Sequence, residues 1–215
     1  MSKRGMNVSS WGSIPAGMAV GIVVAMLSVG CSTPASLPPS IAVGLEGLRN
    51  EAVSLRGQIE KTVGALKEMM SKPQVDLSPQ YQNFTHELGI LEAKVEEARQ
   101  QRAGTETIVN DQFKAWDENL KQLRNEESRQ RAAERRADTE ATYSGIQQKI
   151  AELKKEWTPF ITDIKDTRQY LKSDLSEEGL HTIEPTTDRV FEQQGNVIKR
   201  LDEVIAEMDN AMKSR

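Results

Sequence analysis

Apolar residues recur every three to four positions along most of the chain, a spacing that predicts amphipathic helices. The expected helices cover residues 41–71, 78–124, 127–173 and 177–213. No strand-like alternation of apolar and polar residues is visible between them. The pattern therefore predicts an all-α fold, an elongated antiparallel bundle of about four long, coiled-coil-like helices.

Prolines and polar breaks set the expected helix boundaries. Ser78 followed by Pro79 is expected to cap the second helix. The apolar stripes of the second and third helices meet near Asn125, where residues 125–128 contain neither Gly nor Pro. We place a bend there, and a single continuous helix is the alternative. Pro159 is expected to kink the third helix, because the apolar stripe continues in phase beyond it. Pro185 either kinks the fourth helix or marks its start.

Helix lengths predict a hairpin that extends beyond its neighbours. The second and third helices, of about 45 residues, should each measure nearly 70 Å at about 1.5 Å per residue, and the other two are shorter. Short turns would place Leu45 near Thr105, and residues 197–208 beside residues 143–153. Residues of about 106–145 should then protrude as a two-helix hairpin, with the start of the first helix at its base.

The beginning of the chain carries a targeting pattern. Lys3 and Arg4 precede an apolar stretch at residues 14–27 that is shorter than the roughly 20 residues of a spanning helix. The segment from Leu27 to Cys31 resembles a bacterial lipobox. We expect a lipoprotein signal peptide at residues 1–30 and lipidation of Cys31; an ordinary signal peptide and an uncleaved anchor are the alternatives.

Residues 31–40 are expected to form a lipidated, Pro/Ser-rich tether, and residues 41–215 the helical bundle domain. Ser32 follows the cysteine, where an aspartate would suggest retention at the inner membrane. The expected location is therefore the bacterial cell envelope, facing the periplasm, with the outer membrane favoured over the inner. More than one acyl chain would anchor the protein stably in the membrane.

The composition indicates a polar protein with a thin hydrophobic core. Charged residues make up 28% of the chain and aromatic residues 5%, which favours long helices around a thin core over a thick globule. The formal net charge is −4. Removal of residues 1–30 would leave 26 basic against 32 acidic side chains, or −6, because every Asp and Glu lies beyond Cys31. Since Cys31 is the single cysteine, no internal disulfide is expected.

Candidate chemistry is sparse. Glu178 and His181 have the Glu-x-x-His spacing of di-iron bundles, but such sites need two copies, and His86 has no Glu three residues before it. Phosphate loops, nucleophile elbows and zinc spacings are not found in the sequence. We expect no enzyme, no catalytic or metal-binding residue and no cofactor; a metal-binding helical-bundle enzyme remains a remote alternative.

The strongest candidate surface is the hairpin tip, residues 121–136, where six basic side chains face three acidic ones. The interpretations are a solvated, ion-paired helix face or a basic docking site for lipid headgroups or an acidic partner. Trp116 and Phe113 should lie across from Arg135 and Asp138, in ordinary core packing or with an arginine stacked on the tryptophan. The candidate interaction surface comprises Lys121, Arg124, Arg129, Arg131, Arg135 and Arg136, with Trp116 beneath them.

Two groups of residues carry a resemblance to a known family. One comprises Phe113, Trp116, Leu120, Asn125, Arg129, Thr139 and Tyr143; the other comprises Pro159, Asp166, Tyr170, Leu171, Lys172 and Leu175. Their order and spacing resemble the signature of an uncharacterised bacterial domain-of-unknown-function family, over residues of about 45–212. The resemblance implies a helical fold and an envelope location, and it brings no activity. Arg131 and Arg136 stand where the family has Ser and Leu, so this tip is more basic.

The sequence thus predicts a membrane-anchored envelope lipoprotein with a structural or protein-interaction role, as a scaffold or adaptor. The alternative is a membrane-surface-binding protein that uses the basic hairpin tip. The expected partners are the membrane, through the lipid anchor, and an envelope protein. Nucleic acid is not expected, and self-association is left open.

Overall fold

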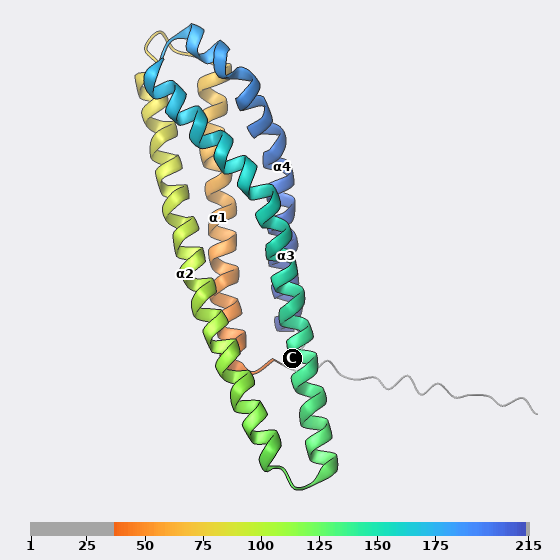
Figure 1. Cartoon of the computed structure of the whole chain (residues 1–215). Coiled ribbons are helices and arrows are strands. Elements are labelled where there is room, and N and C mark those ends of the chain that lie inside the picture. The colour runs from red at the N-terminus through yellow and green to blue at the C-terminus, as the bar shows by residue number, and fades with distance from the viewer. Residues whose placement is uncertain (1–36, 214–215) are drawn as a thin grey trace, which may run out of the picture. The chain divides into compact units, whose positions relative to one another are not determined.

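A computed structural model describes residues 37–213 of the chain. Four helices account for nearly all of this part: α1 (Pro39–Ser71), α2 (Ser78–Gln122), α3 (Glu126–Ser173) and α4 (Glu177–Lys213). They pack antiparallel, without strands in the described residues, as the apolar stripes predict (Figure 1). The expectations for the signal peptide, for Cys31 and for most of the tether lie outside the described residues. None of the described helices is both long enough and apolar enough to cross a membrane.

Two of the three turns are fixed by side-chain caps. The Asn125 side chain accepts a hydrogen bond from the Ser128 amide at 2.8 Å, which starts α3 and confirms the predicted bend. The Ser176 hydroxyl accepts a hydrogen bond from the Gly179 amide at 3.0 Å at the start of α4. These caps satisfy backbone donors that a helix start leaves without intrahelical partners.

The predicted cap of α2 is wrong. Ser78 is the first helical residue, and Leu77 stands at the cap position without a capping side chain. The Ser78 amide instead donates to the Asp76 carboxylate at 2.9 Å, which lowers the pKa of that carboxyl through hydrogen bonds from Ser78. The carboxylate two residues upstream forms a local turn and takes the place of a serine cap.

Both internal prolines lie inside helices. Pro159 is in α3 and Pro185 in α4, and each helix continues past its proline. Pro185 therefore does not mark the start of α4, which begins at Glu177. Phe160, next to Pro159, is fully buried, so the stripe of α3 stays directed at the core.

The four helices are arranged in a ring of neighbours in which α1 packs on α2, α3 on α4, and α4 on α1. Thr105 donates to the Gly44 carbonyl at 3.1 Å, which confirms the predicted register of α1 and α2. Between α3 and α4, Arg200 lies 3.5 Å from Glu152, within the predicted pairing. The remaining pair, α2 and α3, is the most loosely packed of the adjacent pairs.

The hairpin extends beyond the ends of α1 and α4, as helix lengths predict (Figure 1). Ser40, at the start of α1, donates to the Gln112 side chain at 3.2 Å, so the support from α1 stops there. On the other helix, Thr139 is the last buried residue towards the tip. We therefore define the hairpin as residues 113–138, a shorter segment than the expected 106–145, because α1 begins earlier and side chains of α1 and α4 cover its base.

Candidate functional site

The structure places the predicted interaction surface at the free end of the hairpin. Trp116 and Lys121 are on α2, Arg124 is in the three-residue turn, and the other four arginines are on the first turns of α3. Most of these side chains are exposed, whereas Trp116 and Arg136 are half-buried between the two helices. The hairpin therefore brings the predicted residues together on one end of the bundle.

Carboxylates pair with most of the basic side chains at the tip. Lys121 lies 2.7 Å from Glu118, and this hydrogen bond raises the pKa of the lysine. The other pairs in this set are Arg129 with Glu126, Arg131 with Glu127, and Arg136 with both Asp117 and Glu140. Surface pairs of this kind contribute little to stability, about 0–1 kcal/mol each, but they occupy the charges that a docking site would use.

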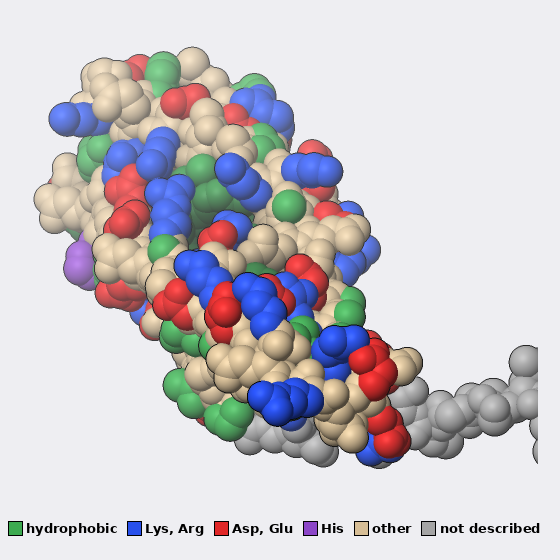
Figure 2. Space-filling view, turned by 60° about the horizontal axis from the view of Figure 1, so that its bottom comes forward, with side chains coloured by type: hydrophobic (Ala, Val, Ile, Leu, Met, Phe, Trp, Pro, Cys, Tyr) green, Lys and Arg blue, Asp and Glu red, His purple; other side chains and the backbone are tan. Residues whose placement is uncertain are grey.

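The paired carboxylates also change the charge of the tip. Over residues 121–136 basic side chains exceed acidic ones by three. Asp117, Glu118, Asp138 and Glu140 lie just outside that window, and three of them pair with its lysine or arginines. Over residues 117–140 there are six basic and seven acidic side chains, so the end of the hairpin is close to neutral. Figure 2 shows red and blue side chains mixed on this end.

Two arginines stack on the aromatic residues of the hairpin. The guanidinium of Arg135 lies 5.7 Å from the ring centre of Trp116, and that of Arg136 lies 5.1 Å from Phe113. Phe113 and Trp116 stack on each other at 6.3 Å. Of the two arrangements that the sequence left open, the arginine stack is therefore present, and it joins α2 to α3 where no third helix supports them.

A second feature, an apolar groove between α2 and α3, is not evident from the sequence. Its volume is about 420 Å³, within the range of roughly 300–1,000 Å³ that is common for ligand sites. The floor is formed by α1 and α4: Leu48, Ala52, Leu55 and Ile59, with Val197, Leu201, Val204 and Met208. The walls are formed by α2 and α3: Val95, Ala98, Arg99 and Arg102, with Ile150, Leu153, Lys154, Trp157 and Thr158.

Contacts between α2 and α3 close the groove at both ends. Away from the hairpin, the Glu92 carboxylate lies 3.1 Å from Arg168 and 3.2 Å from Lys165. Partial burial opposes ionisation of Glu92, but the hydrogen bonds from these two side chains outweigh it and lower the pKa of the carboxyl. Towards the hairpin, Arg136 of α3 pairs with Asp117 and stacks on Phe113, both of α2. The two helices are thus joined above and below the groove.

All charged residues of the groove lining are basic. They are Arg99 and Arg102 of α2 and Lys154 of α3, and the lining contains no carboxylate. Arg99 makes one long contact, 3.7 Å, with Glu96 of its own helix. Arg102 and Lys154 form no ion pair within the described part of the chain. Figure 2 shows a recessed apolar surface with Lys and Arg side chains around it.

One signal in the sequence indicates where this groove lies. The apolar stripe of α2 fails over residues 99–107 and resumes at Ile108 and Val109. This stretch overlaps the groove at Arg99 and Arg102, so the α2 wall of the groove is charged and not apolar there. Periodicity alone does not connect this gap with a cavity.

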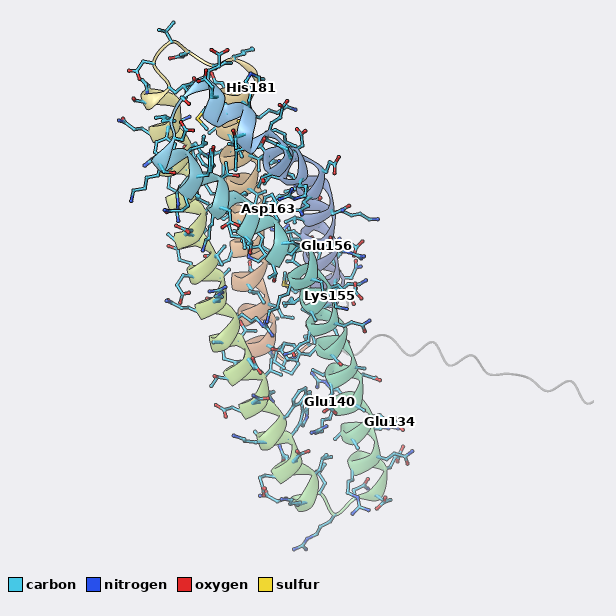
Figure 3. The ribbon with its side chains drawn as sticks, turned by 45° about the horizontal axis from the view of Figure 1, so that its top comes forward. Glu134, Glu140, Lys155, Glu156, Asp163 and His181 are labelled. Carbon is cyan, nitrogen blue, oxygen red and sulfur yellow. The ribbon has the colours of Figure 1, made fainter. Side chains whose placement is uncertain are left out.

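The histidines form no visible site. His86 and His181 are both exposed, and His181, labelled in Figure 3, has a carboxylate neighbour only in Glu184 at 3.8 Å. Among residues 37–213, no three or more His, Cys, Asp or Glu side chains are grouped so that they could hold a metal ion. Asp163, also labelled there, is an α3 carboxylate that binds Arg189 of α4 at 3.1 Å and thereby joins the two helices.

A comparison with protein families identifies the chain's relatives. The family described as a protein of unknown function, DUF2959, matches residues 45–214. The chain belongs to DUF2959. This match covers α1 from residue 45 onwards, the other three helices, the hairpin and the groove of this DUF2959 protein. No curated protein and no solved structure matches it.

Proposed function

We propose that this DUF2959 protein is an envelope lipoprotein, anchored through Cys31, that acts as a scaffold or adaptor by binding a protein partner at its hairpin. The observation that carries this proposal is the change in burial along α2. Leu88 and Leu91 are fully buried among the four helices, whereas Phe113 and Trp116 are only half-buried in the hairpin. The apolar stripe of α2 thus continues into the hairpin, where neither α1 nor α4 covers it.

The chemistry of the hairpin suits a protein partner. Trp and Arg are enriched among the residues that dominate binding energy at protein interfaces. Here Trp116 and Arg135 are stacked and lie at the centre of the hairpin, and ion pairs surround them. An apolar centre with a polar rim is the usual arrangement of such an interface.

The near-neutral end of the hairpin supports a protein partner over the lipid surface. Basic residues attract an anionic membrane by about 1 kcal/mol each when they are free to do so. Four of the six basic side chains at the tip already face carboxylates. We therefore place the lipid-binding tip second.

Site-specific photo-crosslinking in intact cells tests the partner. A photoreactive residue at Ala133, exposed on the hairpin, should give one discrete protein adduct, which Trp116→Ala should reduce. The same residue at Val75, which is exposed in the turn between α1 and α2, is the control and should not give that adduct. Identical adducts from both positions, or adducts with lipid alone, would contradict the proposal.

Two further measurements separate the remaining parts of the proposal. Cys31→Ser should release the protein from the membrane fraction and change its gel mobility; unchanged behaviour would exclude the lipid anchor. Flotation of residues 32–215 with anionic vesicles should be weak and unaffected by Arg129, Arg131, Arg135 and Arg136→Glu. Strong flotation that these changes and salt abolish would favour the lipid-binding tip instead.

A further inference from the structure

We propose that the groove between α2 and α3 binds a single-chain anionic amphiphile, a long-chain fatty acid, with its carboxylate at Arg99 and Arg102. This site lies outside the hairpin and does not depend on the proposed partner. The argument rests on the shape of the groove, the position of its charges and its length.

The floor of the groove is a ready apolar surface. Leu48, Ala52 and Leu55 of α1 keep 7–9% of their surface exposed. Val95, Leu153 and Trp157 on the walls are half-buried, so apolar side chains border the open volume. Packed cores contain few voids larger than a water molecule. A groove of about 420 Å³ is therefore a departure from ordinary helix packing, and an apolar chain would restore the missing contacts.

Two of the three charges, Arg99 and Arg102, lie at one end of this surface. Lys154 lies further along it, because Glu152 pairs with Arg200 of α4 and the nearby Asp202 pairs with Arg56 of α1. Arg102 is three residues from Thr105, which hydrogen-bonds Gly44 near the start of α1, so Arg102 lies at the hairpin end of the groove. Ile59 lines the opposite end. An occupant with a negative head and an apolar tail fits this polarity, with the head at Arg102 and the tail directed towards Ile59.

The sign of these charges selects the head group. The chain as a whole is negative, at −4, yet the groove lining has three basic side chains and no acidic one. Guanidinium and ammonium groups bind carboxylates through short, charge-assisted hydrogen bonds. A neutral lipid would leave these donors unused, and a cationic segment would be repelled.

The length of the groove sets the length of the tail. Leu48 and Ile59 on α1 are eleven residues apart, which corresponds to about 16 Å along the helix. An extended chain advances about 1.2 Å per bond, since three backbone bonds span about 3.6 Å. The groove therefore accommodates a tail of about 14 carbon atoms in extended form.

Photoaffinity labelling of the full chain tests the site. The purified chain in phosphatidylcholine nanodiscs is exposed to myristic acid that carries a diazirine in its tail, and adducts are mapped by mass spectrometry. We expect adducts on residues 95–102 and 150–158 that unlabelled myristic acid displaces. The Arg99→Gln and Arg102→Gln double variant should label about tenfold less, because one charge-assisted hydrogen bond is worth about that factor.

Matched controls separate the head group from the tail. The Lys61→Gln and Lys155→Gln double variant removes the same charge at exposed positions outside the groove lining, and it should label as well as the wild type. Lys155 is adjacent to Lys154 on α3 and is labelled in Figure 3. The corresponding diazirine alcohol should label the wild type about tenfold less than the acid does.

A blocking variant keeps the test independent of the charges. Ala98→Phe places a ring in the groove from its α2 wall and should abolish competed labelling while helicity by circular dichroism is retained. Adducts spread outside the groove, equal labelling by acid and alcohol, or an unaffected double variant of Arg99 and Arg102 would overturn the proposal. A photoreactive residue at Ala98 that crosslinks to residues 1–36 or to a second copy, without fatty-acid labelling, would do so as well.

Discussion

At the scale of single residues, glycines show where two helices approach most closely. A Cβ at Gly44 would lie 3.1 Å from Thr105 Cγ2, whereas a Cβ at Gly57 would meet nothing within 4 Å. Thr105 cannot easily move away, because its hydroxyl donates to the carbonyls of both Gly44 and Gln101. The first glycine is thus required by packing and the second only weakens the helix.

This difference predicts opposite effects for the same substitution. Gly44→Ala should lower the free energy of unfolding by about 1 kcal/mol, since overpacking costs about 1–3 kcal/mol and the gain in helix propensity offsets up to about 1 kcal/mol. Gly57→Ala is the matched control and should raise it by about 0.5–1 kcal/mol. Urea unfolding followed by circular dichroism measures both. Equal effects at the two positions would show that Thr105 does not restrict the contact.

At the scale of helices, the contact of Glu92 with Lys165 and Arg168 holds α2 and α3 together beyond the groove. The carboxyl has a lowered pKa in the folded protein. Its stabilising effect is therefore complete above the unfolded pKa, near 4.5, and is lost as the pH falls through the lower folded value.

Glu92→Gln should accordingly lower the free energy of unfolding by about 1 kcal/mol at pH 7. The difference from the wild type should shrink as the pH falls below about 4.5, because protonation removes the same charge from the wild type. Glu96→Gln is the control. Glu96 pairs with Arg99 at 3.7 Å and accepts a hydrogen bond from Gln100 at 3.3 Å, both on its own helix, and its replacement should change stability by less than about 0.5 kcal/mol. A pH-independent difference between wild type and Glu92→Gln would contradict the assignment.

The helices and their order could be predicted because the apolar spacing, the turn residues and the helix lengths all indicate the same arrangement. The apolar stripes give the helices, Asn125 gives the turn before α3, and the rise per residue places Leu45 near Thr105. The cap at Ser78 was mispredicted because the helix starts one residue earlier, and the Asp76 carboxylate, two residues upstream, accepts from the Ser78 amide. The overestimated charge of the tip has a similar origin, since the carboxylates that neutralise Arg136 lie outside the basic segment.

The groove could not be predicted because periodicity identifies a face without showing what that face meets. Val95, Ala98 and Trp157 continue the apolar stripes of their helices, yet in the structure they border open volume. Whether two stripes touch depends on the separation of the helices, which contacts such as Glu92 with Arg168 decide at a distance along the chain. Only the polar stretch that begins at residue 99 overlaps the groove, and it indicates the charged part of the α2 wall.

At the scale of the whole bundle, the number of neighbours that each helix has differs between the two ends. In the four-helix section each helix has two neighbours, and Ile59, Leu66 and Ile164 are fully buried. In the hairpin, residues 113–138, each helix has one neighbour and no residue is buried. Opening free energies within a protein range from near zero to the global value, and sparsely packed segments lie at the low end. The hairpin should therefore open without unfolding of the rest.

Hydrogen–deuterium exchange of the wild type should then show faster exchange in residues 113–138 than in residues 55–70. Trp116→Ala removes the ring on which Phe113 and Arg135 stack, and it should lower the local opening free energy by about 1–2 kcal/mol. Protection of residues 55–70 should stay unchanged, because no contact of Trp116 reaches them.

Trp157→Ala, at the groove wall, is the contrasting variant and should lower protection in the four-helix section while leaving the hairpin as it is. Loss of protection throughout the chain in Trp116→Ala would show that hairpin and bundle form one cooperative unit, and the hairpin could then not rearrange on a partner without a cost to the whole fold.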